Sequence, residues 1–353
     1  MGPARSNEAK SLPERVQRSQ VGSEATFDAP VTALLWCGER VGITLGDGDV
    51  CFTDASLSTQ SRRNVHKGAI LAAALMPDGR GVITGGDDGV VRCVMPNEPP
   101  LTIASVQRGW ADQVASAPWG AIAWAGGRDI ECLLPNGQTA GFKLPSSCGG
   151  LAFAPKGQRL AAAHYGGVTV FSPALKGASS LKLVWGGSHI AVRWSPDARF
   201  IVTPMQENAL HGWRVNDKAS LHMGGYPSKP RSLGWSRNGR LLATSGSNGA
   251  LLWPFKGKDG PMGKSAQELA PEGTATTAIA FHPKYNILAI GYLSGLVAVV
   301  RLASDAVVTL RGRDENPIDH LVWSTSGKHL AYASSQGLCG ILDMEKIVRE
   351  PLE

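Results

Sequence analysis

The chain has 353 residues, of which 43% are hydrophobic and 18% charged, and this balance supplies a buried core and excludes a fully disordered chain. Its 43 glycines and 22 prolines are typical of a protein that reverses direction often, which favours many short strands. The net charge is +6, and no stretch approaches the length of apolar sequence that crosses a membrane. We therefore expect an all-β protein without a membrane partner.

The start of the chain and the cysteines bear on location. Residues 1–21 contain no apolar run of signal-peptide length, and we expect them to form a disordered N-terminal tail. The six cysteines include no CxxC pair, which argues against a zinc cage and a disulfide framework. Four fall in the same strand of different repeats, where a thiol acts as a small buried hydrophobe: Cys51, Cys93, Cys132 and Cys339. We predict a cytoplasmic protein.

One unit of about 40 residues recurs along the chain. In each copy an apolar strand ends at an aromatic or large residue, and a polar turn follows, as in Trp194-Ser195-Pro196-Asp197. The repeat markers lie near residues 36, 75, 116, 153, 194, 235, 281 and 323, and the copies near 36 and 116 are the poorer ones. A repeat of this length indicates stacked supersecondary units.

Within each unit, three further strands follow the turn. Residues 82–84 and 90–93 are two such strands, and residues 85–89 between them are glycine and aspartate, which suit a tight hairpin. A fourth, more polar strand precedes the next unit, as in residues 101–105. Four antiparallel strands per unit predict one blade of a propeller.

A single blade cannot bury both of its faces, whereas a ring of blades buries them and leaves only short edges. We therefore predict a single closed β-propeller over residues 22–345, with eight four-stranded blades, or seven if the poor third repeat merges with a neighbour. The last repeat lacks an outer strand, because little chain follows Asp343. Residues near Gly22 to Phe27 are expected to supply it as a clasp, and residues 346–353 to form a C-terminal tail.

The repeats from about residue 25 to 345 resemble the WD40 family in a degenerate form, similar to bacterial WD40-like proteins. Trp213 and Trp253 occupy the usual third-strand tryptophan position, but no Trp-Asp dipeptide occurs. No Gly-His opens a repeat either, so the hydrogen-bonded tetrad that the family often uses is not carried over to this chain. The resemblance implies a propeller that binds partners through its faces and is not an enzyme.

Motifs for catalysis and cofactor binding are incomplete. Gly263-Lys264-Ser265 lacks the first glycine of a phosphate-binding loop, because position 258 is lysine. Gly246-Ser247-Asn248-Gly249 has the wrong spacing for a nucleophile elbow and falls on a hairpin. We predict no enzymatic activity, no cofactor and no small-molecule substrate.

Three histidines, His189, His211 and His222, cluster in the fifth repeat. They fall on strands that are normally separated across a blade, so ordinary structural roles are favoured over metal ligation. A metal-responsive or hydrolytic propeller that uses these histidines is the least favoured alternative.

Charge is the asymmetric feature of the sequence. Residues 218–264 contain eight cations and one carboxylate, Asp259, for a net of +7 against +6 for the whole chain. Two loops stand out in this sector, one stiffened by prolines at residues 224–231 and one rich in glycine and lysine at residues 256–267. Loops on a rigid scaffold concentrate binding residues, and stiff loops lose less entropy on binding.

We predict that six residues of this sector contact an acidic partner: Tyr226, Lys229, Arg231, Lys256, Lys258 and Lys264. A solvated basic rim without a partner is the alternative interpretation. The leading hypothesis is thus a non-enzymatic protein–protein interaction scaffold or adaptor that binds an acidic protein segment through the basic side of repeats five and six. A nucleic-acid-associated propeller that uses the same patch is less favoured, because the patch lacks interleaved aromatics for base stacking.

Overall fold

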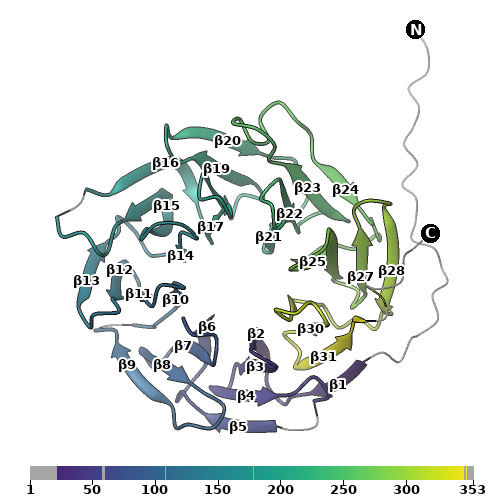
Figure 1. Cartoon of the computed structure of the whole chain (residues 1–353), viewed down its shortest axis with the longest axis horizontal. Coiled ribbons are helices and arrows are strands. Elements are labelled where there is room, and N and C mark those ends of the chain that lie inside the picture. The colour runs from purple at the N-terminus through teal and green to yellow at the C-terminus, as the bar shows by residue number, and fades with distance from the viewer. Residues whose placement is uncertain (1–21, 58–59, 108, 178, 346, 348–353) are drawn as a thin grey trace.

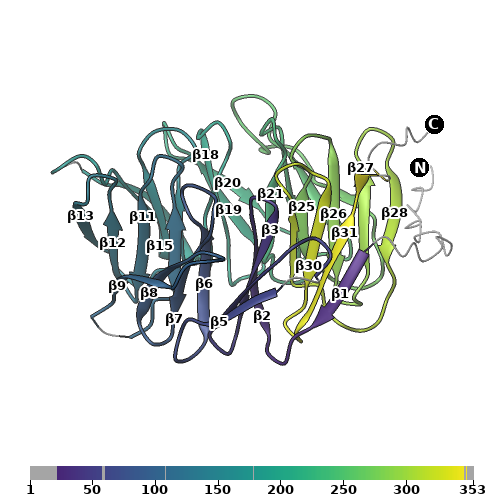
Figure 2. The same ribbon diagram turned by 60° about the horizontal axis from the view of Figure 1, so that its bottom comes forward.

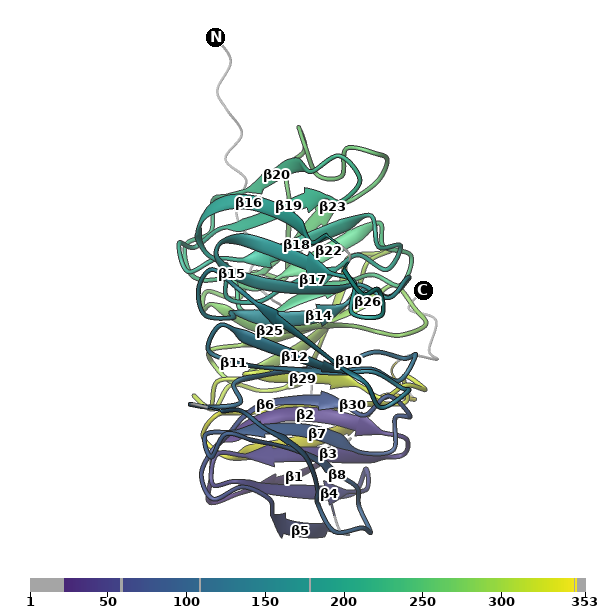
Figure 3. The same cartoon turned by 90° about the vertical axis from the view of Figure 1, so that its left-hand side faces the viewer.

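The computed structural model describes residues 22–57, 60–107, 109–177, 179–345 and 347. These residues form eight antiparallel sheets that stand around a central axis (Figure 1). Viewed from the side, the strands run between the two faces of the ring (Figures 2 and 3). The predicted all-β propeller of eight blades is confirmed, and the seven-blade alternative is wrong. The predicted tails, residues 1–21 and 346–353, lie outside the described residues except for residue 347.

Blades are numbered here in chain order from the first complete one, and in blades 1 to 7 the strands follow the chain from the axis outward. Blade 1 consists of β2 (Val31–Cys37), β3 (Arg40–Leu45), β4 (Asp49–Thr53) and β5 (Gln60–Asn64). Blade 2 consists of β6 (Ile70–Leu75), β7 (Val82–Gly86), β8 (Val90–Val94) and β9 (Leu101–Ser105). Blade 3 consists of β10 (Gln113–Ser116), β11 (Ile122–Gly126), β12 (Asp129–Leu133) and β13 (Thr139–Lys143).

Blades 4 to 7 follow in the same manner. Blade 4 consists of β14 (Gly150–Phe153), β15 (Leu160–Phe171) and β16 (Leu181–Ser188), and blade 5 of β17 (Arg193–Trp194), β18 (Phe200–Pro204), β19 (Leu210–Arg214) and β20 (Ala219–Met223). Blade 6 consists of β21 (Leu233–Trp235), β22 (Leu241–Thr244), β23 (Ala250–Pro254) and β24 (Gln267–Leu269). Blade 7 consists of β25 (Thr276–Phe281), β26 (Ile287–Tyr292), β27 (Val297–Arg301) and β28 (Ala306–Arg311).

Blade 4 contains the long element β15, which supplies two of the four strands. Its first half pairs with β14 and its second half with β16. His164 Nε2 lies 2.9 Å from Thr169 Oγ1, although five residues of extended strand would span about 16 Å. The chain therefore reverses between them, where Gly166 and Gly167 adopt positive φ angles.

Blade 8 combines the two ends of the chain. Its strands β29 (His320–Trp323), β30 (His329–Ala333) and β31 (Leu338–Asp343) are completed by β1 (Gly22–Thr26), which pairs antiparallel with β31 (Figure 2). Phe27 N also donates to Gly337 O at 2.9 Å. The predicted clasp is confirmed as a structural feature.

The tryptophans that mark the repeats join neighbouring blades. Three of them stand near the end of an innermost strand and donate the indole N–H to a backbone carbonyl of the preceding blade, whereas Trp235 Nε1 has no partner among the described residues. These bonds run from Trp36 to Val322, from Trp194 to Ala152 and from Trp323 to Ala280, at 3.0 to 3.1 Å. The repeat marker is therefore an inter-blade tie as well as an apolar side chain.

The core lies between the blades. One buried cluster, for example, joins Trp36 and Ile43 of blade 1 to Ala331 and Ile341 of blade 8. All six cysteines are buried thiols, and burial raises the pKa of Cys132 to about 12. Within the described part of the chain, no helix is long and apolar enough to cross a membrane.

Candidate functional site

The two loops predicted to form one basic site lie at opposite ends of blade 6. Residues 224–232 enter the start of β21, whereas residues 255–266 leave the end of β23. Because β21, β22 and β23 run antiparallel in that order, the start of β21 and the end of β23 are at opposite ends of the sheet. The structure therefore does not bring the six predicted residues together on one surface.

Lys229 and Arg231, on the first loop, line a cavity of about 790 Å³ among the innermost strands of the ring, and this cavity is called the channel mouth below. The cavity is bordered by innermost strands or their leading connections from blades 1, 5, 6, 7 and 8. Arg193, on β17 of blade 5, reaches the same cavity. Because these blades lie around the axis, the ring gathers side chains that are far apart in the sequence (Figure 1).

The charge of this cavity is positive. Among the described lining residues, Arg193, Lys229 and Arg231 face one carboxylate, Asp319, which accepts a hydrogen bond from Ser335 N at 2.7 Å. None of the three cations forms an ion pair with a described residue. Arg193 Nη1 donates only to the carbonyl of Val192, at 3.1 Å. The cavity can thus accept the charge of an anionic ligand.

Burial lowers the pKa values of two groups in this cavity, Arg193 and His320. The side chain of Arg193 is exposed within the cavity, but protein atoms surround it on most sides. The guanidinium is therefore less hydrated than in water, and this lowers its pKa. A guanidinium nevertheless stays protonated in proteins. Burial also lowers the pKa of His320, whose Nε2 lies 3.2 Å from Val31 O, and at neutral pH His320 adds no positive charge.

Hydroxyl groups stiffen the loop that carries Lys229 and Arg231. Ser245 Oγ accepts from the backbone N of Arg231 at 3.1 Å and from Ser232 N at 3.0 Å. Thr276 is also among the lining residues, but its Oγ1 is buried and has no hydrogen-bond partner among the described residues. The hydroxyl of Ser245 thus fixes the backbone next to Arg231.

Tyr226 supports this loop from within. Its side chain is only 6% exposed, its hydroxyl lies 2.7 Å from Thr244 Oγ1, and it accepts from Trp253 Nε1 at 2.7 Å. Burial raises its pKa. The prediction that Tyr226 touches a partner does not fit this burial, because its hydroxyl is hydrogen-bonded inside blade 6.

The remaining predicted residues belong to the opposite face. Lys256, Lys258 and Lys264 are exposed, and Lys264 Nζ donates to the carbonyls of Lys256 and Gly260 at 2.9 and 2.8 Å. Arg214 Nη1 holds the same loop through Lys258 O at 2.8 Å. Lys264 thus closes its own loop, whereas the ammonium groups of Lys256 and Lys258 have no hydrogen-bond partner in the part of the chain that the structure describes.

Blade 2 contains a buried set of hydrogen-bonded side chains. It had not been expected, because no Gly-His dipeptide opens a repeat. His66 Nδ1 lies 2.9 Å from Asp88 Oδ1, and His66 Nε2 lies 2.9 Å from Thr84 Oγ1. Burial alone would raise the pKa of Asp88, but hydrogen bonds from His66 and the backbone outweigh it and lower that pKa to about 2. The set was missed because valine, not glycine, precedes His66.

The histidines of the fifth repeat have structural partners. His211 and His222 are cross-strand neighbours on β19 and β20, and His189 Nδ1 lies 2.7 Å from Thr203 Oγ1. Trp185 stacks on His211 with ring centroids 3.9 Å apart. Within the described ranges, no group of three His, Cys, Asp or Glu side chains is placed to hold a metal ion. The metal-responsive alternative therefore gains no geometric support.

Comparison with known proteins agrees with the geometry. The family model "WD domain, G-beta repeat" matches residues 58–94, which include the His66 set, and "Anaphase-promoting complex subunit 4 WD40 domain" matches residues 279–348. A curated protein of Schizosaccharomyces pombe (strain 972 / ATCC 24843), "Periodic tryptophan protein 2 homolog", is 25% identical over 172 residues. The match covers 42% of this chain and about a fifth of the length of that relative.

Among solved structures, the computationally designed Ika8 protein superimposes with a TM-score of 0.73 over 90% of this chain and 97% of its own. At 15% identity this likeness concerns the fold alone. The fold is that of a closed β-propeller with eight blades. The two family matches, over residues 58–94 and 279–348, and the eight blades support a WD40-repeat β-propeller, and members of that family generally bind protein partners and are not generally enzymes.

Proposed function

We propose that the chain is a non-enzymatic cytoplasmic scaffold whose channel mouth binds an acidic segment of a partner protein. The observation that carries this proposal is the convergence of Arg193, Lys229 and Arg231 on one cavity of about 790 Å³ without ion-pair partners among the described residues. Ion pairs between exposed side chains contribute about 0–1 kcal/mol each, so several of them must act together. Carboxylates are the protein groups that satisfy several such cations at once.

The loop geometry supports affinity as well as charge. Two prolines, the Ser245 hydrogen bonds and the buried Tyr226 hydroxyl hold Lys229 and Arg231 before any partner arrives. A preorganised loop gives up less conformational entropy on binding. The partner segment would therefore meet a cavity whose cations already point into shared space.

A nucleic acid could neutralise the same cations through its phosphates, and this is the competing proposal. Base stacking would need aromatic side chains, and the described lining contains no aromatic ring except that of His320. The acidic segment is therefore favoured. A steep, linear loss of log affinity with log salt concentration for an oligonucleotide would support the competitor.

The test compares two charge reversals of equal size on opposite faces. In one variant Lys229→Glu is combined with Arg231→Glu, and in the matched control Lys256→Glu is combined with Lys258→Glu. Binding of a fluorescent peptide of alternating glutamate and serine is followed by anisotropy at physiological salt. We expect the first pair to weaken binding at least tenfold, about 1.4 kcal/mol, and the control pair to weaken it less than about twofold.

Two outcomes would contradict the channel-mouth proposal. Equal losses in both variants would mean that the peptide responds to total charge, which is the solvated-rim interpretation. Undiminished binding in the first variant would remove the cavity from consideration. An Arg193→Gln variant adds a further check and should also weaken binding, since Arg193 reaches the same cavity from a different blade.

A further inference from the structure

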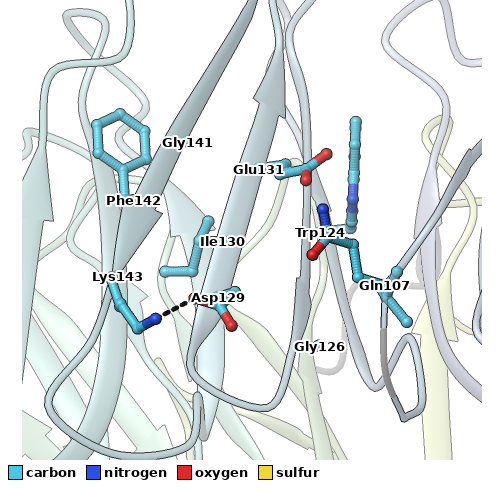
Figure 4. Close-up of a pocket in the computed structure, with 10 residues that line it drawn as sticks. Gln107, Trp124, Gly126, Asp129, Ile130, Glu131, Gly141, Phe142 and Lys143 are labelled. Atoms are coloured by element: carbon cyan, nitrogen blue, oxygen red, sulfur yellow. Dashed lines mark ion pairs between the residues drawn. The ribbon is translucent and has the colours of Figure 1, made fainter.

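We propose a second interaction site, a groove between blades 2 and 3 that binds a basic side chain of a partner segment. The groove has a volume of about 470 Å³ and lies between Val106 and Gln107, which follow β9, and the strands β11 to β13 (Figure 4). It differs from the channel mouth in residues, blades and sign of charge. The inference therefore stands independently of the proposed function.

The register of the strands places Trp124, Glu131 and Gly141 in one row across blade 3. Trp124 on β11 pairs with Glu131 on β12, and Glu131 pairs with Gly141 on β13, so the three share one face of the sheet. Figure 4 shows the side chains of Trp124 and Glu131 beside each other in this groove. A hydrogen-bond donor and a carboxylate therefore border the same space.

Both groups lack partners within the described residues. Glu131 is exposed and forms neither an ion pair nor a hydrogen bond there. Trp124 lines the groove although it is only 3% exposed, and its Nε1 forms no hydrogen bond with a described residue. The neighbouring carboxylate differs, because Asp129 forms an ion pair with Lys143 at 3.5 Å. With two carboxylates and one lysine among its lining residues, the groove is negative on a chain of net charge +6.

Glycines make room for a ligand in this row. A Cβ atom built on Gly141 would meet no other atom within 4 Å, so the groove is open there. At Gly126 a Cβ would lie 3.0 Å from the Val106 side chain and 3.2 Å from the carbonyl of Trp110, so the groove is closed at that end. Trp110 itself is 61% exposed, and exposed tryptophans are favoured anchors in protein interfaces.

The chemistry of the row selects the occupant. The carboxylate of Glu131 attracts an ammonium or guanidinium group, and Trp124 Nε1–H can donate to a backbone carbonyl of the segment that carries it. The aliphatic stem of lysine or arginine can cover the apolar Val106 while its charged end reaches the carboxylate. An acidic segment would be repelled by Glu131 and Asp129.

The experiment uses the full chain and three small probes. N-acetyl-arginine amide and N-acetyl-lysine amide carry the cation, and N-acetyl-citrulline amide is the neutral counterpart of the first. Binding is followed by the indole ¹H–¹⁵N signal of Trp124, which is identified by its loss in Trp124→Phe. We expect a saturable shift with at least one cationic probe and a shift at least fivefold smaller with citrulline at equal concentration.

Three substitutions make the test specific. Glu131→Gln should weaken the cationic probe at least tenfold, and Gly141→Leu should block it without a change of charge. Lys143→Gln, in the same groove, should leave affinity unchanged or raise it. Unaltered thermal midpoints will show that the exposed substitutions leave the fold intact. Citrulline binding as strong as arginine, full binding by Glu131→Gln, or no saturable shift with either cation would overturn the proposal.

Discussion

The hydroxyl of Tyr226 lies 2.7 Å from Thr244 Oγ1, across the join between a loop and the second strand of blade 6. The same relationship recurs between His66 and Thr84 in blade 2 and between His189 and Thr203 in blade 5. In each of these three blades, a polar residue that precedes the innermost strand forms a hydrogen bond with a buried threonine on the second strand. Three different sequences thus build one kind of internal brace.

The brace in blade 6 predicts a cost for removing one oxygen atom. Tyr226→Phe deprives both Thr244 and Trp253 Nε1 of their buried partner. We expect the free energy of unfolding in urea to fall by about 1–3 kcal/mol, the usual penalty for an unsatisfied buried group. Tyr285→Phe, at a side chain 56% exposed, is the control and should change stability little. Equal effects in the two variants would argue against the brace.

Two tryptophans at equivalent positions offer a matched pair. Trp323 Nε1 donates to Ala280 O at 3.0 Å, whereas Trp235 Nε1 is buried without a partner among the described residues. Substitution by phenylalanine removes similar volume at both sites but breaks a hydrogen bond only at Trp323. We expect Trp323→Phe to destabilise the protein by about 1 kcal/mol more than Trp235→Phe. Denaturation curves that rank the two in the opposite order would contradict the inter-blade tie.

Acid should destabilise the fold through His211. Burial lowers the pKa of this fully buried histidine from 6.5 to about 3, so at pH 5 only the unfolded chain binds the proton. The stabilisation is complete above pH 6.5 and is lost as the pH falls toward the folded-state value. Linkage gives a loss of about 2 kcal/mol from this residue between pH 7 and pH 5.

The variant His211→Phe separates this effect from the other titrating groups. It keeps a ring against Trp185, with which His211 stacks, but cannot bind a proton. Its unfolding free energy should therefore decline less between pH 7 and pH 5 than that of the parent chain, whatever its stability at pH 7. Parallel pH profiles would show that His211 is not held neutral.

Removal of the clasp should weaken the whole ring. Without residues 1–27, β31 loses its antiparallel partner, and Glu24 no longer accepts from Arg311 of blade 7 at 2.8 Å. Because blades bury their faces only against neighbours, we expect the calorimetric transition to broaden and its midpoint to fall by several degrees. A chain that begins at residue 22 is the reference. An unchanged, sharp transition after the longer deletion would mean that β1 contributes no closure.

The sequence by itself determined the period, the strands and the closing role of residues near Gly22. These features depend on local patterns, namely apolar strands, glycine-rich reversals and an outer strand missing from the last repeat. The buried cysteines follow from the same alternation. The sequence did not predict the His66 set, because a buried hydrogen-bond network depends on which side chains meet in the folded chain. The Gly-His dipeptide that usually accompanies such a set is not required for it.

Only the tertiary structure decided which charged residues share a surface. Lys229 and Lys256 are close in the sequence, but the strands between them reverse direction and carry them to opposite faces of blade 6. Conversely, Arg193 lies in another repeat, and the curvature of the ring brings it to the cavity of Lys229. Composition counts charges along the chain, whereas a binding site depends on directions and distances that exist only after the blades close around their axis.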